Sequence, residues 1–203
     1  MQVHRLVETS FGYFVTPLIS MAMGVVLLKE KISRIRLAAM ALALVAVVVK
    51  AVQLGQVPWI AVILSVSFAF YGFIRKQTPV DPLDGLTVET LVLLPFALVW
   101  LSAAAADGNG AFVNDGVWIS SLLVLGGLLT AGPLALFAAG ARRVRMSTLG
   151  FLQYLTPSIT LILAVTQMGE RFTPLDAMSF GSIWTALLLV SLEAPLSRLV
   201  RVR

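Results

Sequence analysis

The sequence predicts an all-α integral membrane protein with seven transmembrane helices, and three observations support this. Hydrophobic residues make up 59% of the 203 residues and charged residues only 12%, about half of the charged share of soluble domains. Seven apolar runs are each long enough to cross a hydrocarbon core of about 30 Å as a helix. Basic residues gather in short clusters between these runs, mostly on one side of the membrane if every run crosses it.

The seven runs follow one another through short connectors. They lie near 10–28, 35–52, 57–74, 86–105, 117–141, 147–168 and 175–192. Ser33 is the predicted N-cap of the second helix and Thr173 that of the seventh, where Pro174 and Asp176 also favour a helix start. The connectors 78–85 and 107–116 are rich in turn-forming residues.

The first and sixth runs contain two copies of one segment. A shift of 140 residues places FGYFVTPLISMAMGVVLLKEKIS (11–33) over FLQYLTPSITLILAVTQMGERFT (151–173) without a gap. We interpret the pair as an internal duplication. The matching acids Glu30 and Glu170 are expected to act locally, at the turns before Ser33 and Thr173.

The distribution of basic residues predicts the orientation of the helices. If all seven runs cross the membrane, twelve Lys and Arg residues fall on one side and three on the other, namely Arg5, Lys50 and Arg171. The basic side is expected to be cytoplasmic, which places the C-terminus inside and Met1 outside. Since the first and sixth runs are five crossings apart, the two copies must point in opposite directions, as in an inverted repeat.

The inverted repeat predicts the domain organisation. Residues 53–203 form a complete five-helix repeat, and residues 1–52 form the last two helices of another. We therefore expect three further helices before residue 1, with Met1 an internal or mis-assigned start or the boundary of a fragment.

The composition also excludes several classes of protein. The chain has no cysteine and a single histidine, His4, so neither a thiolate metal site nor an imidazole-based active site is expected. We expect no cofactor and no catalytic residue. The net charge of +5 does not indicate nucleic-acid binding, because the basic residues are distributed as membrane topology requires.

Three long stretches of the sequence resemble the EamA branch of the drug/metabolite transporter superfamily. They are ETSFGYFVTPLISMAMGVVLLKEKIS, PWIAVILSVSFAFYGFIRKQTPVDPLDGLTVETLVLLP and RMSTLGFLQYLTPSITLILAVTQMGERFTPLDAMSFGSIWTALLLVSLE. The resemblance implies a ten-helix carrier in the bacterial inner membrane, built from two inverted five-helix repeats, that exports small metabolites or drugs. Its expected partners are the lipid bilayer and a small-molecule substrate. The sequence leaves open whether the chain forms a homo-oligomer.

The repeated prolines indicate a candidate substrate site. Proline lacks a backbone N–H, so Pro17 frees the carbonyl of Tyr13 and Pro157 that of Gln153. Carriers of this type bind substrate where helices are interrupted near the midplane. We hypothesise that these four residues and Tyr154 line the site. The alternative is that the prolines only bend two spanning helices.

Three further residues are substrate-site candidates. Ser67 and Tyr71 share a face of the third helix with Arg75, and this face either lines a wet cavity or packs against other helices, with Arg75 at the cytoplasmic interface. Glu89 lies in the fourth span, where it either couples transport to protons or is a first-turn carboxylate stabilised by the helix dipole.

The sequence thus favours a transmembrane transporter that works by alternating access. A truncated, non-transporting membrane fragment or scaffold is the alternative. An integral-membrane enzyme is less well supported, because the carboxylates occur on different helices without the spacing of a catalytic pair.

Overall fold

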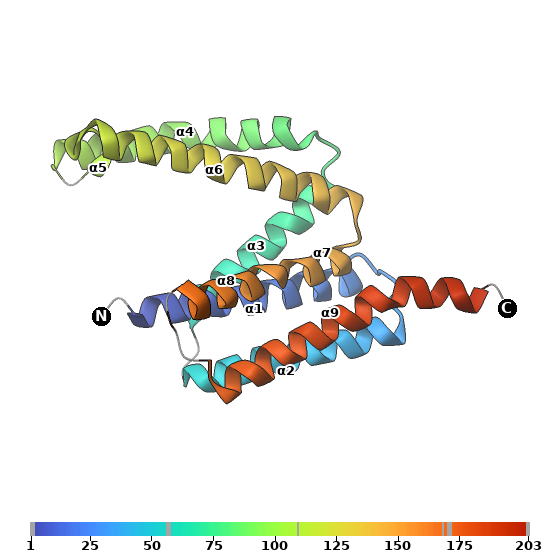
Figure 1. Cartoon of the computed structure of the whole chain (residues 1–203). Coiled ribbons are helices and arrows are strands. Elements are labelled where there is room, and N and C mark those ends of the chain that lie inside the picture. Colours follow the sequence, from blue (N-terminus) through green and yellow to red (C-terminus); the bar gives the residue numbers. More distant parts are fainter. Residues whose placement is uncertain (1–2, 56–57, 109, 168, 170–171, 202–203) are drawn as a thin grey trace. The chain divides into compact units, whose positions relative to one another are not determined.

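The computed structural model describes residues 3–55, 58–108, 110–167, 169 and 172–201, which contain helices and no strand (Figure 1). The helical segments in chain order are α1 (Val3–Val26), α2 (Arg34–Leu54), α3 (Trp59–Gln77), α4 (Pro82–Ala106), α5 (Ala111–Asn114), α6 (Gly116–Arg143), α7 (Met146–Gln153), α8 (Leu155–Gln167) and α9 (Pro174–Arg201).

Each of the seven predicted spans coincides with one of these helices or with the consecutive pair α7 and α8. Six are long and apolar enough to cross a membrane, and α1 contributes a shorter apolar stretch, Phe11–Val26, within the residues searched. The predicted limits Val57 and Met168 lie outside the described residues, as do Glu170 and Arg171. The single turn α5 lies in a connector for which no helix was predicted.

Two of the predicted helix starts are confirmed by their capping bonds. The hydroxyl of Ser33 accepts a 3.1 Å hydrogen bond from the backbone N–H of Arg36, and that of Thr173 accepts one of 3.2 Å from Asp176. These bonds satisfy N–H groups that have no partner inside the helix. The start of α4 differs from the expectation, because Asp81 caps the helix and Pro82 opens it, one turn earlier than predicted.

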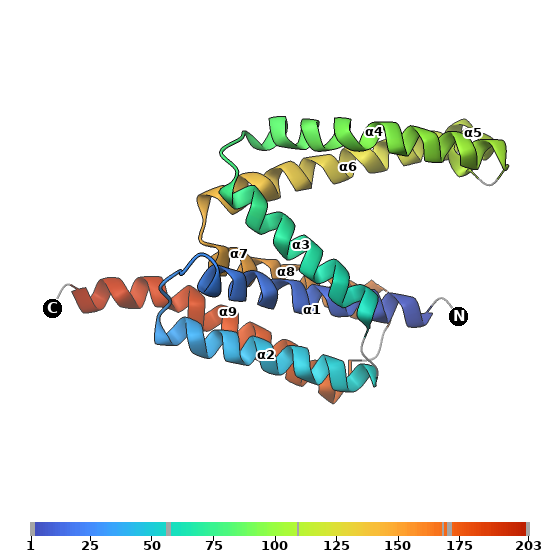
Figure 2. The same ribbon diagram turned by 180° about the vertical axis from the view of Figure 1, so that it is seen from behind.

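The chain divides into two compact units, which we describe separately. The first comprises residues 1–74 and 144–203, and the second residues 75–143. In the first unit, α1 packs along α7 and α2 packs along α9 (Figures 1 and 2). Its core is formed by aromatic, aliphatic and alanine side chains of these four helices.

Both of these helix pairs are antiparallel. Along α7, Ser147 lies beside Gly24, near the end of α1, whereas Tyr154 bonds to Phe14, ten residues earlier on α1. Along α9, Asp176 pairs with Lys50 near the end of α2, whereas Glu193 pairs with Arg36 near its start. The two copies of the repeated segment therefore run in opposite directions where they pack together.

Six pairs of described residues related by the 140-residue shift are buried in both members. The buried residues of α2, Ala39, Ala43 and Ala46, correspond under the 140-residue shift to Ser179, Ile183 and Ala186 of α9, which are also buried. Likewise, Phe11, Phe14 and Pro17 of α1 correspond to Phe151, Tyr154 and Pro157 of the α7–α8 segment. Other pairs differ, since Ser20 and Met23 are buried whereas their counterparts Thr160 and Leu163 are exposed.

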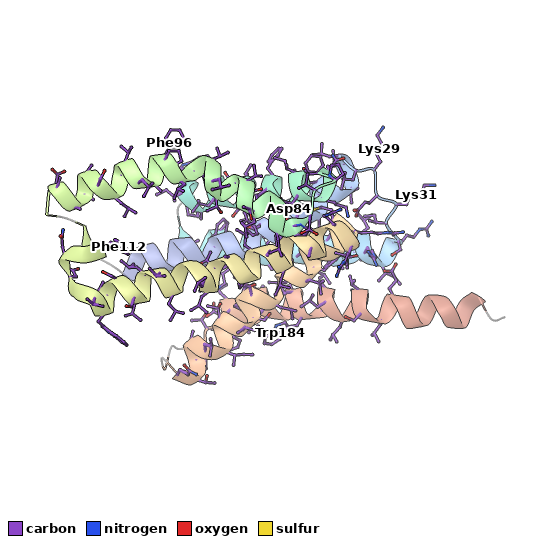
Figure 3. The ribbon with its side chains drawn as sticks, turned by 90° about the horizontal axis from the view of Figure 1, so that it is seen from above. Lys29, Lys31, Asp84, Phe96, Phe112 and Trp184 are labelled. Atoms are coloured by element: carbon purple, nitrogen blue, oxygen red, sulfur yellow. The ribbon has the colours of Figure 1, made fainter. Side chains whose placement is uncertain are left out.

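The second unit exposes apolar surface on every side. Among the described residues of this unit, α4 has no buried residue and α6 has two, Ala138 and Ala141. Phe96 projects from α4 and is 71% exposed (Figure 3). A helix that is apolar all round requires an apolar surrounding, which for these spans is the hydrocarbon of the bilayer.

Candidate functional site

The sixth span is interrupted three residues before its proline. α7 ends at Gln153, and α8 begins at Leu155. At this break the carbonyl of Tyr154 accepts a 2.9 Å hydrogen bond from the hydroxyl of Ser158. By contrast, α1 continues through Pro17 without a break. Of the two predicted interruptions, the structure therefore contains the one in the second copy.

A glycine allows α1 and α7 to come close together beside this break. A Cβ atom on Gly150 would lie 2.6 Å from the carbonyl oxygen of Pro17 and 2.5 Å from Cγ of Met21, closer than nonbonded atoms approach. One turn further on, the buried hydroxyl of Tyr154 donates a 3.1 Å hydrogen bond to the carbonyl of Phe14. Pro17 and Tyr154 are thus held in the contact between the two copies.

Gln153 is a buried amide with unused hydrogen-bonding capacity. Neither its Oε1 nor its Nε2 has a hydrogen-bond partner among the described residues, and both atoms are buried. The same holds for the hydroxyl of Ser20 on α1. An unpaired polar group in an apolar interior costs about 1 to 3 kcal/mol, so a bound water or a polar ligand would stabilise this part of the unit.

A cavity of about 440 Å³ lies in the first unit between α1, α2, α8 and α9. Two of the predicted site residues, Tyr13 and Pro157, line it. Its walls are mostly aromatic and aliphatic, and one wall carries the ion pair of Lys50 with Asp176, whose charged atoms are 2.5 Å apart. This volume and this mixture of apolar walls with a few polar groups are typical of small-molecule sites.

The predicted residues of α3 lie elsewhere in the first unit. Ser67 is exposed, and Tyr71 is half-buried beside the ring of Phe68. Ser65, on the same part of α3, is buried, and its hydroxyl donates to the carbonyls of Ala61 at 2.7 Å and Gly12 at 3.2 Å. Within the described residues, α3 contributes none of the side chains that line the cavity.

Glu89 belongs to the second unit and pairs with a buried arginine. Its carboxylate lies 3.6 Å from the guanidinium of Arg75, whose side chain is 5% exposed, and Arg75 also donates to the carbonyl of Pro82 at 2.6 Å. A Cβ atom on Gly85 would overlap this guanidinium. One expectation was therefore wrong: Glu89 lies about two turns inside α4 rather than in its first turn. Arg75 is buried, and its place at the cytoplasmic interface stays a prediction.

Glu30 caps a distant helix. Its carboxylate accepts hydrogen bonds from the backbone N–H groups of Met146 and Ser147 at 2.6 and 3.0 Å and from the Ser147 hydroxyl at 2.6 Å. A carboxylate at a helix N-terminus binds free N–H groups and complements the helix dipole. The expected local role at the turn before Ser33 was therefore incomplete, and the matching Glu170 lies outside the described residues.

Among the cavity-wall residues that sequence reasoning missed are Lys50, Asp176, Phe14 and Phe180. Asp176 was identified only as part of a helix start, and Lys50 only as one of three basic residues on its side. A signal for Lys50 existed, because a charge inside an apolar run is a functional candidate. Its partner could not be identified, since the two residues are 126 positions apart.

Comparison with known proteins places these features in a family context. Residues 57–192 match the EamA-like transporter family. The uncharacterized transporter YojE of Bacillus subtilis is 40% identical over 91% of this chain and 61% of its own length. The uncharacterized transporter PA0485 of Pseudomonas aeruginosa is 42% identical over 94% of this chain and 64% of its own length.

A third relative, the protein RarD of Escherichia coli, is 38% identical over 94% of this chain and 64% of its own length. The chain thus spans less than two thirds of the length of each of these relatives. No solved structure matches the chain.

Proposed function

The chain belongs to the EamA-like transporter family of the drug/metabolite transporter superfamily, and we propose that it is part of a permease that exports small metabolites or drugs across the bacterial inner membrane. The proposed mechanism is alternating access. The complete protein in this proposal is a ten-helix carrier made of two inverted five-helix repeats. Residues 53–203 would form one repeat, and residues 1–52 the last two helices of the other.

One observation carries this proposal. The two copies of the repeated segment pack antiparallel, and the contact between Phe14 and Tyr154 joins residues 140 positions apart, the interval of the duplication. Two copies related in this way can exchange their packing environments when a carrier passes between its inward-open and outward-open states. A membrane scaffold would not require this relationship.

For the substrate site we propose the region around the α7–α8 break and the adjoining cavity. Tyr13 and Pro157 line the cavity, and Gln153 offers an unpaired donor and acceptor among the described residues. Pro17 and Tyr154 hold the two copies together behind it. Ser67, Tyr71 and Glu89 remain proposed substrate contacts, each to be tested separately because the described lining of the cavity includes none of them.

Mass spectrometry of the culture medium tests this proposal. A strain lacking the gene is complemented with the complete carrier, with its Gln153→Ala variant, or with Gln167→Ala, a matched control at an exposed position of α8. We expect the complete carrier to export at least one small molecule, Gln153→Ala to lower that export about 10-fold, and the control to retain it. Equal export by both variants would remove Gln153 from the site, and export by none of the strains would favour the scaffold.

A further inference from the structure

The ammonium group of Lys50 on the cavity wall is surrounded by four side chains, which together form a cage. The ammonium of Lys50 donates to Oδ1 of Asp176 at 2.5 Å and to Oε1 of Gln53 at 3.0 Å. It also lies 5.6 Å from the ring centroid of Phe14 and 5.5 Å from that of Phe180. A carboxylate, an amide oxygen and two aromatic faces are the groups that recognise a primary ammonium.

The protein holds the carboxylate of Asp176 more firmly than the ammonium of Lys50. The other oxygen of Asp176, Oδ2, accepts from the backbone N–H of Thr173 at 3.0 Å and from its hydroxyl at 2.7 Å. Asp176 is therefore fixed as part of the cap of α9. Lys50 has a flexible four-carbon stem, lies about one turn before the end of α2 and keeps 19% of its side chain exposed.

This asymmetry decides which ion a ligand can replace. A carboxylate ligand would have to take Lys50 from Asp176, which the bonds to Thr173 hold in place, and would leave that carboxylate without its cation. An ammonium ligand needs only Oδ1, and the released Lys50 side chain can extend to water from the last turns of α2. The cavity beside the cage, about 440 Å³ in volume, has room for the rest of a small amine.

We propose that this cavity binds substrates through a primary ammonium group, which takes the place of Lys50 in the cage formed by Asp176, Gln53, Phe14 and Phe180. This inference rests on the proposed transport function and assigns its substrate class as small organic amines. Lys50 acts as a tethered competitor, which occupies the cage when no amine is bound.

The exchange also changes the contact between two helices. α2 and α9 are joined by Lys50–Asp176 near one end and by Arg36–Glu193 near the other. An amine in the cage replaces the first tie and leaves the second intact. Binding of substrate therefore exchanges the direct Lys50–Asp176 tie for a bridge from Gln53 of α2 through the amine to Asp176 of α9, and Nε2 of Gln53 also donates to Oδ1 of Asp176 at 3.4 Å.

Chemical rescue of a Lys50→Ala variant in lipid nanodiscs tests the proposal. The probe is n-butylammonium, which carries the charged group and carbon chain of lysine, and n-butanol is its neutral control. We expect n-butylammonium to bind the variant saturably and to raise its melting temperature. Binding to the parent protein is expected to be about 10-fold weaker, because tethered Lys50 competes at a high effective concentration.

A second pair of variants tests whether the aromatic wall of the cage contributes to amine binding. A Phe180→Leu change in the Lys50→Ala background keeps the wall apolar and should weaken n-butylammonium binding, whereas an exposed control, Phe172→Leu, should not. Equal affinities of the parent protein and Lys50→Ala, or equal rescue by n-butanol, would overturn the proposal. These assays measure binding alone, so a carrier that exports molecules without an amine contradicts only this inference, and amine binding without export contradicts only the transport function.

Discussion

The hydroxyl of Tyr154 donates a 3.1 Å hydrogen bond to the backbone carbonyl of Phe14, and the two residues occupy the same position in the two copies of a repeated segment. This contact therefore joins equivalent positions of the two copies directly. Both side chains are buried there, Tyr154 completely and Phe14 to all but 3%. This contact is therefore the point at which to test how much the pairing of the copies contributes to stability.

Removal of the Tyr154 hydroxyl should destabilise the protein by about 1 kcal/mol, the usual contribution of a helix-to-helix hydrogen bond in a membrane protein. The variant is Tyr154→Phe, and unfolding by titration with SDS measures the effect. Tyr13→Phe is the matched control, because Tyr13 is 44% exposed and should show no change. Equal effects of the two substitutions would mean that the contact with Phe14 contributes nothing.

A methyl group at Gly150 should be more damaging. Its Cβ would lie 2.6 Å from the carbonyl of Pro17, so α1 and α7 must separate, and we expect a loss of about 2 kcal/mol or more. The same assay checks Gly150→Ala against Gly181→Ala, whose Cβ meets no described atom within 4 Å. The control should be neutral or slightly stabilising, since alanine favours a helix; similar losses at both sites would contradict the close approach.

Glu30→Ala should destabilise the start of α7. The N–H groups of Met146 and Ser147 lose the acceptor that the carboxylate provides, at a cost of about 1 to 3 kcal/mol. Hydrogen exchange of these two amides should become faster, whereas Asp84→Ala, at an exposed site of the second unit, should leave them unchanged. Unaltered exchange in Glu30→Ala would show that other groups cap the helix.

The spans and caps were predictable because they depend on local sequence. Apolar length marks a span, and Ser33 and Thr173 lie directly before the helices that they cap. The target of Glu30 was not predictable, because it lies 116 residues away and only packing brings the two together. Gly24 and Gly150 lie where two helices come close together, yet nothing in the sequence around them distinguishes them from glycines that contact nothing.

The two prolines lie in different local structure, although the duplication pairs them. In the second copy, the hydroxyl of Ser158 bonds to the carbonyl of Tyr154 where the helix is interrupted. The corresponding residue of the first copy is Leu18, which has no hydroxyl. This difference accompanies the break but does not account for it, because Thr16 and Ser179 make the same hydroxyl-to-carbonyl bond inside the unbroken helices α1 and α9.

Gly85 and Arg75 should act as one unit in a double-mutant cycle. Gly85→Ala pushes the guanidinium from its place beside Glu89 and the Pro82 carbonyl, so each of Gly85→Ala and Arg75→Gln should destabilise the protein. The combined variant should be little worse than Arg75→Gln alone, because the first change acts through the second residue. Strictly additive losses would show that the two residues stabilise the protein independently.

The antiparallel arrangement of the two copies is the central claim, and site-specific labelling in cells tests it most directly. A single cysteine is placed after each copy, as Lys31→Cys or Phe172→Cys, at positions that are exposed. The complete carrier is first cleared of any other cysteine; this chain contains none. We predict that a membrane-impermeant maleimide labels Phe172→Cys in intact cells and Lys31→Cys only after the membrane is permeabilised. Labelling of both positions from the same side would contradict the inverted arrangement and the carrier built on it.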